Sequence, residues 1–190
     1  MKLVLASQSP RRRQMIESLG LAPEICPAHI DEQALPDELP KAHVSRLARE
    51  KCWAVDRSGM VLAADTIVVV DQRILGKPRD YVDFCTMMSW LSGRTHQVMT
   101  GWHLRSPQGE RSGVTETGVK FVQLTTAQID AYWGSGEPAD KAGGYGIQGW
   151  GGLFVESIEG DFNNVVGLPL QAVALGMAEL GLDPWGLNAR

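Results

Sequence analysis

One stretch of this chain constrains the fold more than any other: GMVLAADTIVVVD, residues 59–71. The run is almost continuously apolar, which is typical of a strand that is buried on both faces. Such a strand belongs in a sheet that helices cover on both sides. Asp65 interrupts the run. Because burying an unpaired carboxylate costs on the order of several kcal/mol, we expect Asp65 to pair with a cation, to bind a metal ion or to lie at a cleft. A structural salt bridge is the alternative to a catalytic role.

The other predicted elements alternate between strand and helix at first and continue with antiparallel strands. Expected strands cover residues 2–6, 59–71, 95–106, 112–124 and 153–158, and expected helices cover residues 9–19, 41–56, 80–91, 126–133 and 168–181. The sequence between these elements predicts loops over residues 22–40 and 134–152, the second one rich in glycine. This pattern predicts an α/β fold of the mixed α+β kind, a twisted mixed β-sheet flanked by helices.

The first predicted helix begins with an unfavourable charge. Ser9 is a suitable N-cap and Pro10 fits the first helical position, but Arg11, Arg12 and Arg13 fill the first turn. A helix N-terminus carries about half a positive charge, so cations there oppose the helix dipole. A bound phosphate would make the arginines its bidentate partners. The alternative is an exposed basic turn, and for Arg13 we expect a solvated surface charge.

Two lysines stand out by their position. Lys51 falls on the apolar stripe of the helix predicted over residues 41–56. Its amine either reaches water along the aliphatic stem or points inward at an anion. Lys77 precedes Pro78, which favours an extended backbone at the lysine, and an ordinary loop lysine is the alternative. His96 is interpreted as a structural residue at the start of a strand.

The string GYGIQG, residues 144–149, matches the GxGxxG pattern of dinucleotide-binding loops. That motif requires a strand before it and a helix after it, whereas here a polar loop precedes it and a strand follows. We therefore reject the dinucleotide interpretation. We expect the glycines to let the backbone approach a ligand closely. We expect the Gln148 side chain to recognise an amide or carbonyl edge of that ligand by hydrogen bonding.

Composition narrows the class of protein. A net charge of −4 argues against binding to nucleic acid or to an anionic membrane. Three cysteines without CxxC spacing favour reduced thiols and a cytoplasmic location. The N-terminal segment lacks the apolar stretch of a signal peptide, and no apolar run reaches the ~18 residues of a membrane-spanning helix. We expect a cytoplasmic protein with a small-molecule partner, no nucleic acid and no membrane.

Several further stretches follow one another along the chain: LASQSPRR, AADTIVV, GKP, LSGRTHQVMTG, EPADKAGGYGIQG and GDFNNVVGLP. In this order and at this spacing they resemble the Maf family of nucleoside triphosphate pyrophosphatases, also called septum-formation inhibitor proteins. The family's dTTP/UTP branch has arginine, ADT and IQG where this chain has Arg11, Thr66 and Gln148. The branch that prefers 7-methyl-GTP has tryptophan, glutamine and glutamate there, so the resemblance favours the dTTP/UTP branch.

The resemblance also implies site residues and an architecture. It implies catalytic roles for Glu32, Lys51, Asp65 and Lys77, phosphate binding by Ser7 and Arg12, and selection of the base by Arg11, Thr66 and Gln148. Asp65 and Glu32 would also hold a divalent metal cation, Mg²⁺ or Mn²⁺. The expected architecture is a single domain over residues 1–190 of the inosine triphosphatase type, with two lobes around a central cleft.

The expected reaction is hydrolysis of dTTP or UTP, or of modified pyrimidine triphosphates, to the monophosphate and pyrophosphate. It requires cations for the triphosphate, a metal that bridges oxygens, and a water in line with the α-phosphorus. The alternative is a nucleotide-binding regulator of cell division and septum formation with little catalysis. The sequence leaves open the physiological nucleotide, the preferred metal, the division of base and metal-ligand roles between Asp65 and Glu32, and the oligomeric state, with a homodimer among the expected states.

Overall fold

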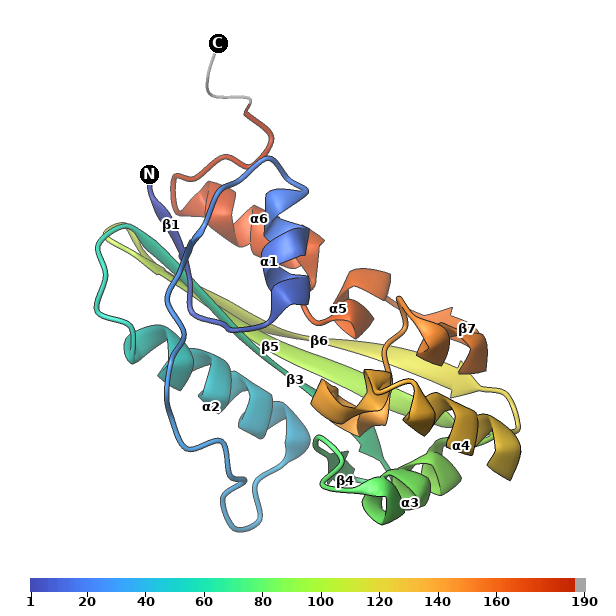
Figure 1. The fold of residues 1–190 in the computed structure, drawn as a ribbon. Helices are drawn as coiled ribbons and strands as arrows, with labels where there is room; N and C mark the ends of the chain where they lie inside the picture. Colours follow the sequence, from blue (N-terminus) through green and yellow to red (C-terminus); the bar gives the residue numbers. More distant parts are fainter. Residues whose placement is uncertain (187–190) are drawn as a thin grey trace. The chain divides into compact units, whose positions relative to one another are not determined.

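The computed structural model describes residues 1–186, and its strands form a seven-stranded mixed sheet (Figure 1). The strands are β1 (Leu3–Leu5), β2 (Glu24–Ile25), β3 (Met60–Val70), β4 (Arg73–Leu75), β5 (Thr95–Ser106), β6 (Gly109–Phe121) and β7 (Val155–Glu159). Their order is β2-β1-β3-β5-β6-β7, and β4 pairs with β3. β1 runs parallel to β2 and β3, whereas β4 is antiparallel to β3 and β7 to β6. The predicted mixed sheet is confirmed.

Most helices lie within a few residues of their predicted bounds, but the short helix over Phe162–Val166 was not predicted. They are α1 (Pro10–Glu17), α2 (Pro40–Trp53), α3 (Tyr81–Leu91), α4 (Thr126–Gly134), α5 (Phe162–Val166) and α6 (Leu170–Glu179). The Ser9 side chain caps α1 by accepting a bond from the Arg12 N–H, and Thr125 and Gln128 form a capping box on α4. In the part of the chain that the structure describes, no helix is long and apolar enough to cross a membrane.

The chain forms two compact units. Among the described residues, unit 1 consists of Met1–Asp65, Thr100–Thr115 and residues 167–186, and unit 2 consists of Thr66–Met99 and Glu116–Val166. The chain passes from one unit to the other within β3, β5 and β6. The single domain over residues 1–190 and the central cleft stay predictions.

The core of unit 1 lies where β1 and β3 meet α2. All three residues of β1 are buried, and Val4 pairs in register with Val61 of β3. Cys52 of α2 belongs to the same apolar cluster. Gly101 of β5 lets the α2 backbone lie directly on the strand, because a Cβ at this position would be 2.2 Å from the carbonyl oxygen of Val44. The position of α2 on the sheet is therefore set by a contact between two backbones.

The core of unit 2 is rich in aromatic rings. Phe84 and Phe121 are fully buried, and Phe121 packs edge-on against Tyr145 with ring centroids 4.7 Å apart. His96, in β5, is buried beside them, and its Nε2 atom is 2.8 Å from the Tyr145 hydroxyl. Burial lowers the pKa of His96 to about 4. The structural interpretation of His96 agrees with this packing.

Short elements escaped prediction. β4 follows a tight turn in which Asp71 and Gln72 both have positive φ, at 48° and 63°. Hairpin turns with this backbone favour Asn-Gly or Asp-Gly, so the Asp-Gln pair gives little turn signal. Within the glycine-rich stretch the chain forms three 3₁₀ turns, η1 (Glu137–Asp140), η2 (Ala142–Gly144) and η3 (Trp150–Phe154), the last of which includes the expected start of β7.

Candidate functional site

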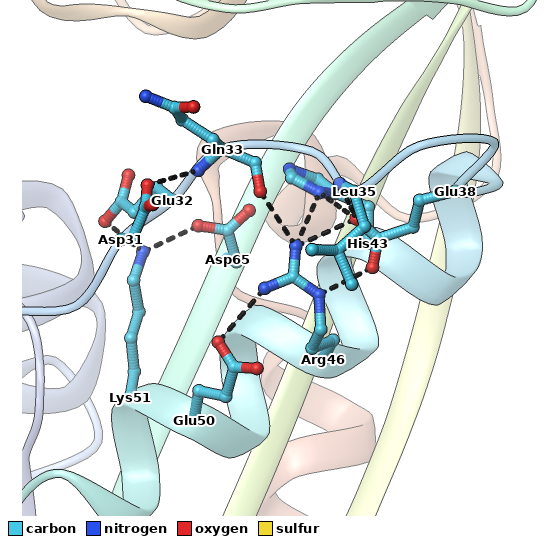
Figure 2. A network of polar contacts seen from close by, with 10 residues as sticks. All are labelled: Asp31, Glu32, Gln33, Leu35, Glu38, His43, Arg46, Glu50, Lys51 and Asp65. Carbon is cyan, nitrogen blue, oxygen red and sulfur yellow. Dashed lines mark hydrogen bonds and ion pairs between the residues drawn. The ribbon is translucent and has the colours of Figure 1, made fainter.

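In unit 1 the ammonium group of Lys51 lies against two carboxylates (Figure 2). Its Nζ atom is 2.7 Å from Asp65 Oδ1 and 2.6 Å from Glu32 Oε1. Lys51 and Asp65 are 8% and 7% exposed, whereas the side chain of Glu32 is 58% exposed. The sequence left the direction of the Lys51 amine open, and in the structure it points inward. Asp65 pairs with a cation, which is one of the three alternatives predicted for it from the sequence.

The local structure explains how these side chains meet. Asp65 lies in β3 and is itself buried, so its carboxylate needs a partner. Lys51 is in the last turn of α2, where the helix dipole favours a cation. Glu32 comes from the loop that joins β2 to α2 and approaches the same ammonium from the solvent side. The cluster carries two negative charges and one positive charge, with one carboxylate open to water.

Arg12 ties the start of α1 to three other segments of unit 1. Its Nε donates to the carbonyl of Gly167 at 2.8 Å, and Nη1 donates to the carbonyl of Ala64 at 2.8 Å and to the Ser7 hydroxyl at 3.2 Å. Burial lowers the pKa of Arg12 from its ordinary value, and the nearby Asp65 carboxylate opposes this change. Ser7 and Arg12 therefore lie beside Asp65 in the structure, and phosphate binding by these two residues stays a prediction.

The three arginines of the first turn divide by environment. Arg13 is exposed and forms an ion pair with Glu17 at 2.7 Å, one helical turn later, so its expected surface role is confirmed. Arg11 is only partly buried, close enough to Arg12 for its charge to lower the pKa of that group. Selection of the base by Arg11 stays a prediction.

The remaining predicted site residues, Thr66, Lys77 and Gln148, belong to unit 2. Lys77 and Gln148 are exposed, and Thr66 is partly buried. The backbone N–H of Gly143 donates to the carbonyl of Gly76 at 2.9 Å, which joins the segment of Lys77 to the glycine-rich segment that carries Gln148. The structure thus brings two of the predicted segments together within this unit.

Two glycines of GYGIQG have a packing role that the sequence did not predict. A Cβ on Gly149 would lie 2.3 Å from Glu137 Oε2, and a Cβ on Gly146 would lie 2.6 Å from Lys141. The loop wraps around the chain's own Glu137, whose carboxylate accepts bonds from the N–H groups of Trp150 and Gly151 and from the Tyr132 hydroxyl. The glycines thus allow a close approach to side chains of the chain itself, and the approach to a ligand stays a prediction.

Burial alone would raise the pKa of Glu137, but the bonds from the Trp150 N–H, the Tyr132 hydroxyl and the Gly151 N–H outweigh it and lower that pKa. The hydroxyl of Tyr132 also accepts a bond from the Gly146 N–H at 3.1 Å. Glu137 and Tyr132 therefore organise the loop from inside. The sequence offered no signal for this beyond a carboxylate shortly before the glycines.

A second polar network, next to Lys51, was also missed by sequence reasoning (Figure 2). Arg46 grips the carboxylate of Glu38 with Nε at 2.6 Å and Nη2 at 2.8 Å. These hydrogen bonds lower the pKa of Glu38 far below its usual range. His43 Nδ1 lies 2.9 Å from Glu38 Oε2, and this hydrogen bond also lowers the pKa of Glu38. The only sequence signal was the spacing of His43, Arg46 and Glu50 on one helix face.

The carboxylates can be tested for fit to a divalent metal. Among residues 1–186 no group of three or more His, Cys, Asp and Glu side chains is arranged to hold a metal ion. Mg²⁺ typically takes one or two carboxylates together with substrate phosphates and water. Asp65 and Glu32, both within 2.7 Å of Lys51 Nζ, form a donor set of that kind. The residues fit a metal that is shared with a phosphate ligand better than one held by the protein alone.

The family model and the similar curated proteins agree on one relationship. A family model described as "Maf-like protein" matches residues 2–180. A protein of Anaeromyxobacter dehalogenans (strain 2CP-1) named dTTP/UTP pyrophosphatase is 51% identical over 97% of each chain. A protein of Moorella thermoacetica with the same name is 50% identical over 97% of this chain and 98% of its own length. A solved HAM1 protein from Coxiella burnetii covers 98% of this chain and 93% of its own, with a TM-score of 0.46 and 13% identity.

Proposed function

This chain belongs to the Maf-like protein family, and on that premise we propose that it is a nucleoside triphosphate pyrophosphatase that hydrolyses dTTP and UTP to the monophosphate and pyrophosphate. The observation that carries the proposal is the cluster of Lys51, Asp65 and Glu32. A buried carboxylate held by an ammonium group, with a second carboxylate open to water, supplies both a proton acceptor and metal ligands.

The proposed chemistry begins at Asp65. Its carboxylate takes a proton from a water molecule, whose oxygen forms a bond to the α-phosphorus. The bond from this phosphorus to the oxygen that bridges to the β-phosphorus breaks, and pyrophosphate leaves. Lys51, 2.7 Å from Asp65, fixes the orientation of the carboxylate. Asp65 and Glu32 would hold Mg²⁺ or Mn²⁺, which when bound neutralises the charge on the phosphate oxygens.

The other predicted residues complete the proposal. Ser7 and Arg12 bind phosphate at the start of α1, and Lys77 adds a positive charge. Arg11, Thr66 and Gln148 select the pyrimidine, since a site that hydrogen-bonds a base edge rejects a base with unmatched polar groups. We also infer a cytoplasmic location, in keeping with the free thiols of Cys26, Cys52 and Cys85. A homodimer is the oligomeric state that we propose to test by light scattering.

The decisive experiment measures pyrophosphate release from dTTP, UTP, CTP and 7-methyl-GTP during titration with Mg²⁺ and Mn²⁺. We expect turnover of dTTP and UTP that depends on the metal. Tight binding of dTTP without release of pyrophosphate, with every metal and at every pH, would instead support a nucleotide-binding regulator.

A matched pair of variants tests the role of Asp65. Asp65→Asn should lower kcat by ~10²-fold or more, in line with the loss of a general base. Asp71→Asn is the control, because Asp71 is also ion-paired with a cation, Arg94 at 2.6 Å, but is exposed and lies outside the cluster. Near-normal turnover by Asp65→Asn would remove Asp65 from the mechanism.

A further inference from the structure

Arg46 joins the helix that carries Lys51 to the loop that carries Glu32 (Figure 2). Two of its nitrogens form a fork on the Glu38 carboxylate, and Nη2 also donates to the backbone carbonyl of Gln33 at 3.0 Å. Gln33 follows Glu32 directly in the chain. Arg46 and Lys51 therefore hold the same loop from the same helix, one through the backbone and the other through the Glu32 carboxylate.

The loop around these contacts is built as a compact turn. The N–H of Leu35 donates to Glu38 Oε2 at 3.1 Å, and the N–H of Glu38 donates back to the carbonyl of Leu35 at 3.1 Å. Asp37 takes a positive φ of 56° to close this turn. Although the loop runs through solvent-exposed residues, the side chain of Glu38 is only 7% exposed. Glu38 is thus the buried end of an otherwise exposed loop.

The turn continues up to Glu32 itself. The N–H of Gln33 donates to the Asp31 carboxylate at 3.0 Å, so both backbone groups of Gln33 are bonded, one to Asp31 and one to Arg46. These bonds fix the backbone on the C-terminal side of Glu32. A freely moving loop would present the exposed Glu32 carboxylate to Lys51 for only part of the time, because an exposed ion pair by itself is weak.

We propose that Arg46 is a positioning residue, which acts through the loop of residues 31–38 to hold Glu32 beside Lys51 and Asp65. The role of Glu32 in this inference rests on the proposed function. The planar guanidinium suits the task because it binds both oxygens of Glu38 and still reaches the Gln33 carbonyl, a geometry that a single ammonium group does not offer.

One arm of Arg46 provides an internal control. Its Nη1 donates to Glu50 at 3.0 Å, an exposed contact between two residues of α2. Glu50→Gln removes the charge of that pair and leaves the grip on the loop in place. Arg111→Ala is a second control, since Arg111 is an exposed arginine of unit 1 that is ion-paired with Glu179.

The first test needs no substrate. Hydrogen exchange is measured on peptides that cover residues 31–38 in the wild-type protein and the variants. Arg46→Ala should speed exchange of these amides by ~10-fold or more, and Glu50→Gln and Arg111→Ala should not. Arg46→Lys should lie between, and it carries the test alone if Arg46→Ala does not fold. Unchanged exchange in both Arg46 variants would overturn the inference.

The second test measures whether Arg46 acts through Glu32. Kinetics with dTTP are compared for Arg46→Lys, Glu32→Gln and the double variant. If Arg46 only positions Glu32, the double variant should have a kcat within about 3-fold of Glu32→Gln alone. If Arg46 has a merely structural role, the factors by which the two single substitutions lower kcat should multiply in the double variant. Multiplied losses would therefore refute the positioning role, as would full activity of Glu32→Gln.

The two tests separate the two failures. If the wild-type protein releases no pyrophosphate from any nucleotide, the proposed function is wrong, and the hydrogen-exchange result still decides whether Arg46 holds the loop. If the wild-type protein is active but the Arg46 variants exchange the amides of residues 31–38 at the wild-type rate, the function stands and the positioning role is wrong.

Discussion

Protonation of His96 should destabilise this protein well above the pH at which most carboxylates titrate. The imidazole is buried in unit 2, with its ring 4.9 Å from that of Phe121 and its Nε2 bonded to the Tyr145 hydroxyl. Within the described residues its Nδ1 atom has no hydrogen-bond partner. A second proton would place a positive charge among aromatic rings, and burial accordingly lowers the pKa of His96 to about 4.

The sign and size of the effect follow from the two pKa values. In the unfolded chain His96 has its ordinary value of 6.5, so between pH 6.5 and about 4 the unfolded state binds a proton that the folded state excludes. The stability contribution of neutral His96 is complete above this range and is lost as the pH falls through it. Linkage gives a loss of about 2 kcal/mol between pH 7 and pH 5, and about 3 kcal/mol once the pH is below 4.

Urea unfolding at pH 7 and pH 5 checks this prediction. His96→Gln keeps an amide that can bond the Tyr145 hydroxyl but does not titrate, so its free energy of unfolding should fall by about 2 kcal/mol less than that of the wild type. His29→Gln is the control, because His29 is exposed. If the wild type and His96→Gln lose the same stability between the two pH values, the reasoning about His96 is wrong.

Three further substitutions test other parts of the structure. Lys51→Met should lower the free energy of unfolding by about 3 kcal/mol in urea titrations, since it leaves Asp65 buried without its ammonium partner, and adding Asp65→Asn should recover part of the loss. Glu137→Gln should speed hydrogen exchange of the loop amides at residues 146–151, and unchanged exchange would show that the carboxylate does not organise the loop. Gly143→Ala should lower Tm, because Gly143 has a φ of +68° and its Cβ would lie 2.8 Å from Val68; an unchanged Tm would contradict the close packing.

The sequence predicted those features that depend on neighbouring residues. The apolar run around Asp65 predicted the buried strand β3, and Ser9 with Pro10 predicted the start of α1. The position of Lys51 on the apolar stripe of its helix made an inward-pointing amine one of two predicted alternatives, and the structure has this one. In each case the physical cause, burial of a strand or satisfaction of a helix end, acts within a few residues of the chain.

The features that escaped prediction depend on partners from distant segments. Nothing in the loop sequence distinguishes Glu38, which Arg46 buries, from Asp31 and Glu32, which stay exposed. Likewise GYGIQG has the composition of a ligand-binding loop, and only the coordinates place Glu137 inside it. The choice of a side chain's partner is made by tertiary packing, which one sequence does not encode in a local pattern.

The contact of Gly101 with α2 fixes the distance between this helix and β5, and so the positions of the side chains that α2 brings to the site. A Cβ at this position would have to move from 2.2 Å to an ordinary separation from the Val44 carbonyl, so any larger residue displaces the helix by roughly 1 Å. Arg46 and Lys51 both lie in that helix and would shift together with it. Since a misplacement of about 1 Å far from the chemistry can cost 10²-fold in rate, a missing methyl group on β5 governs the alignment of charges that it never touches.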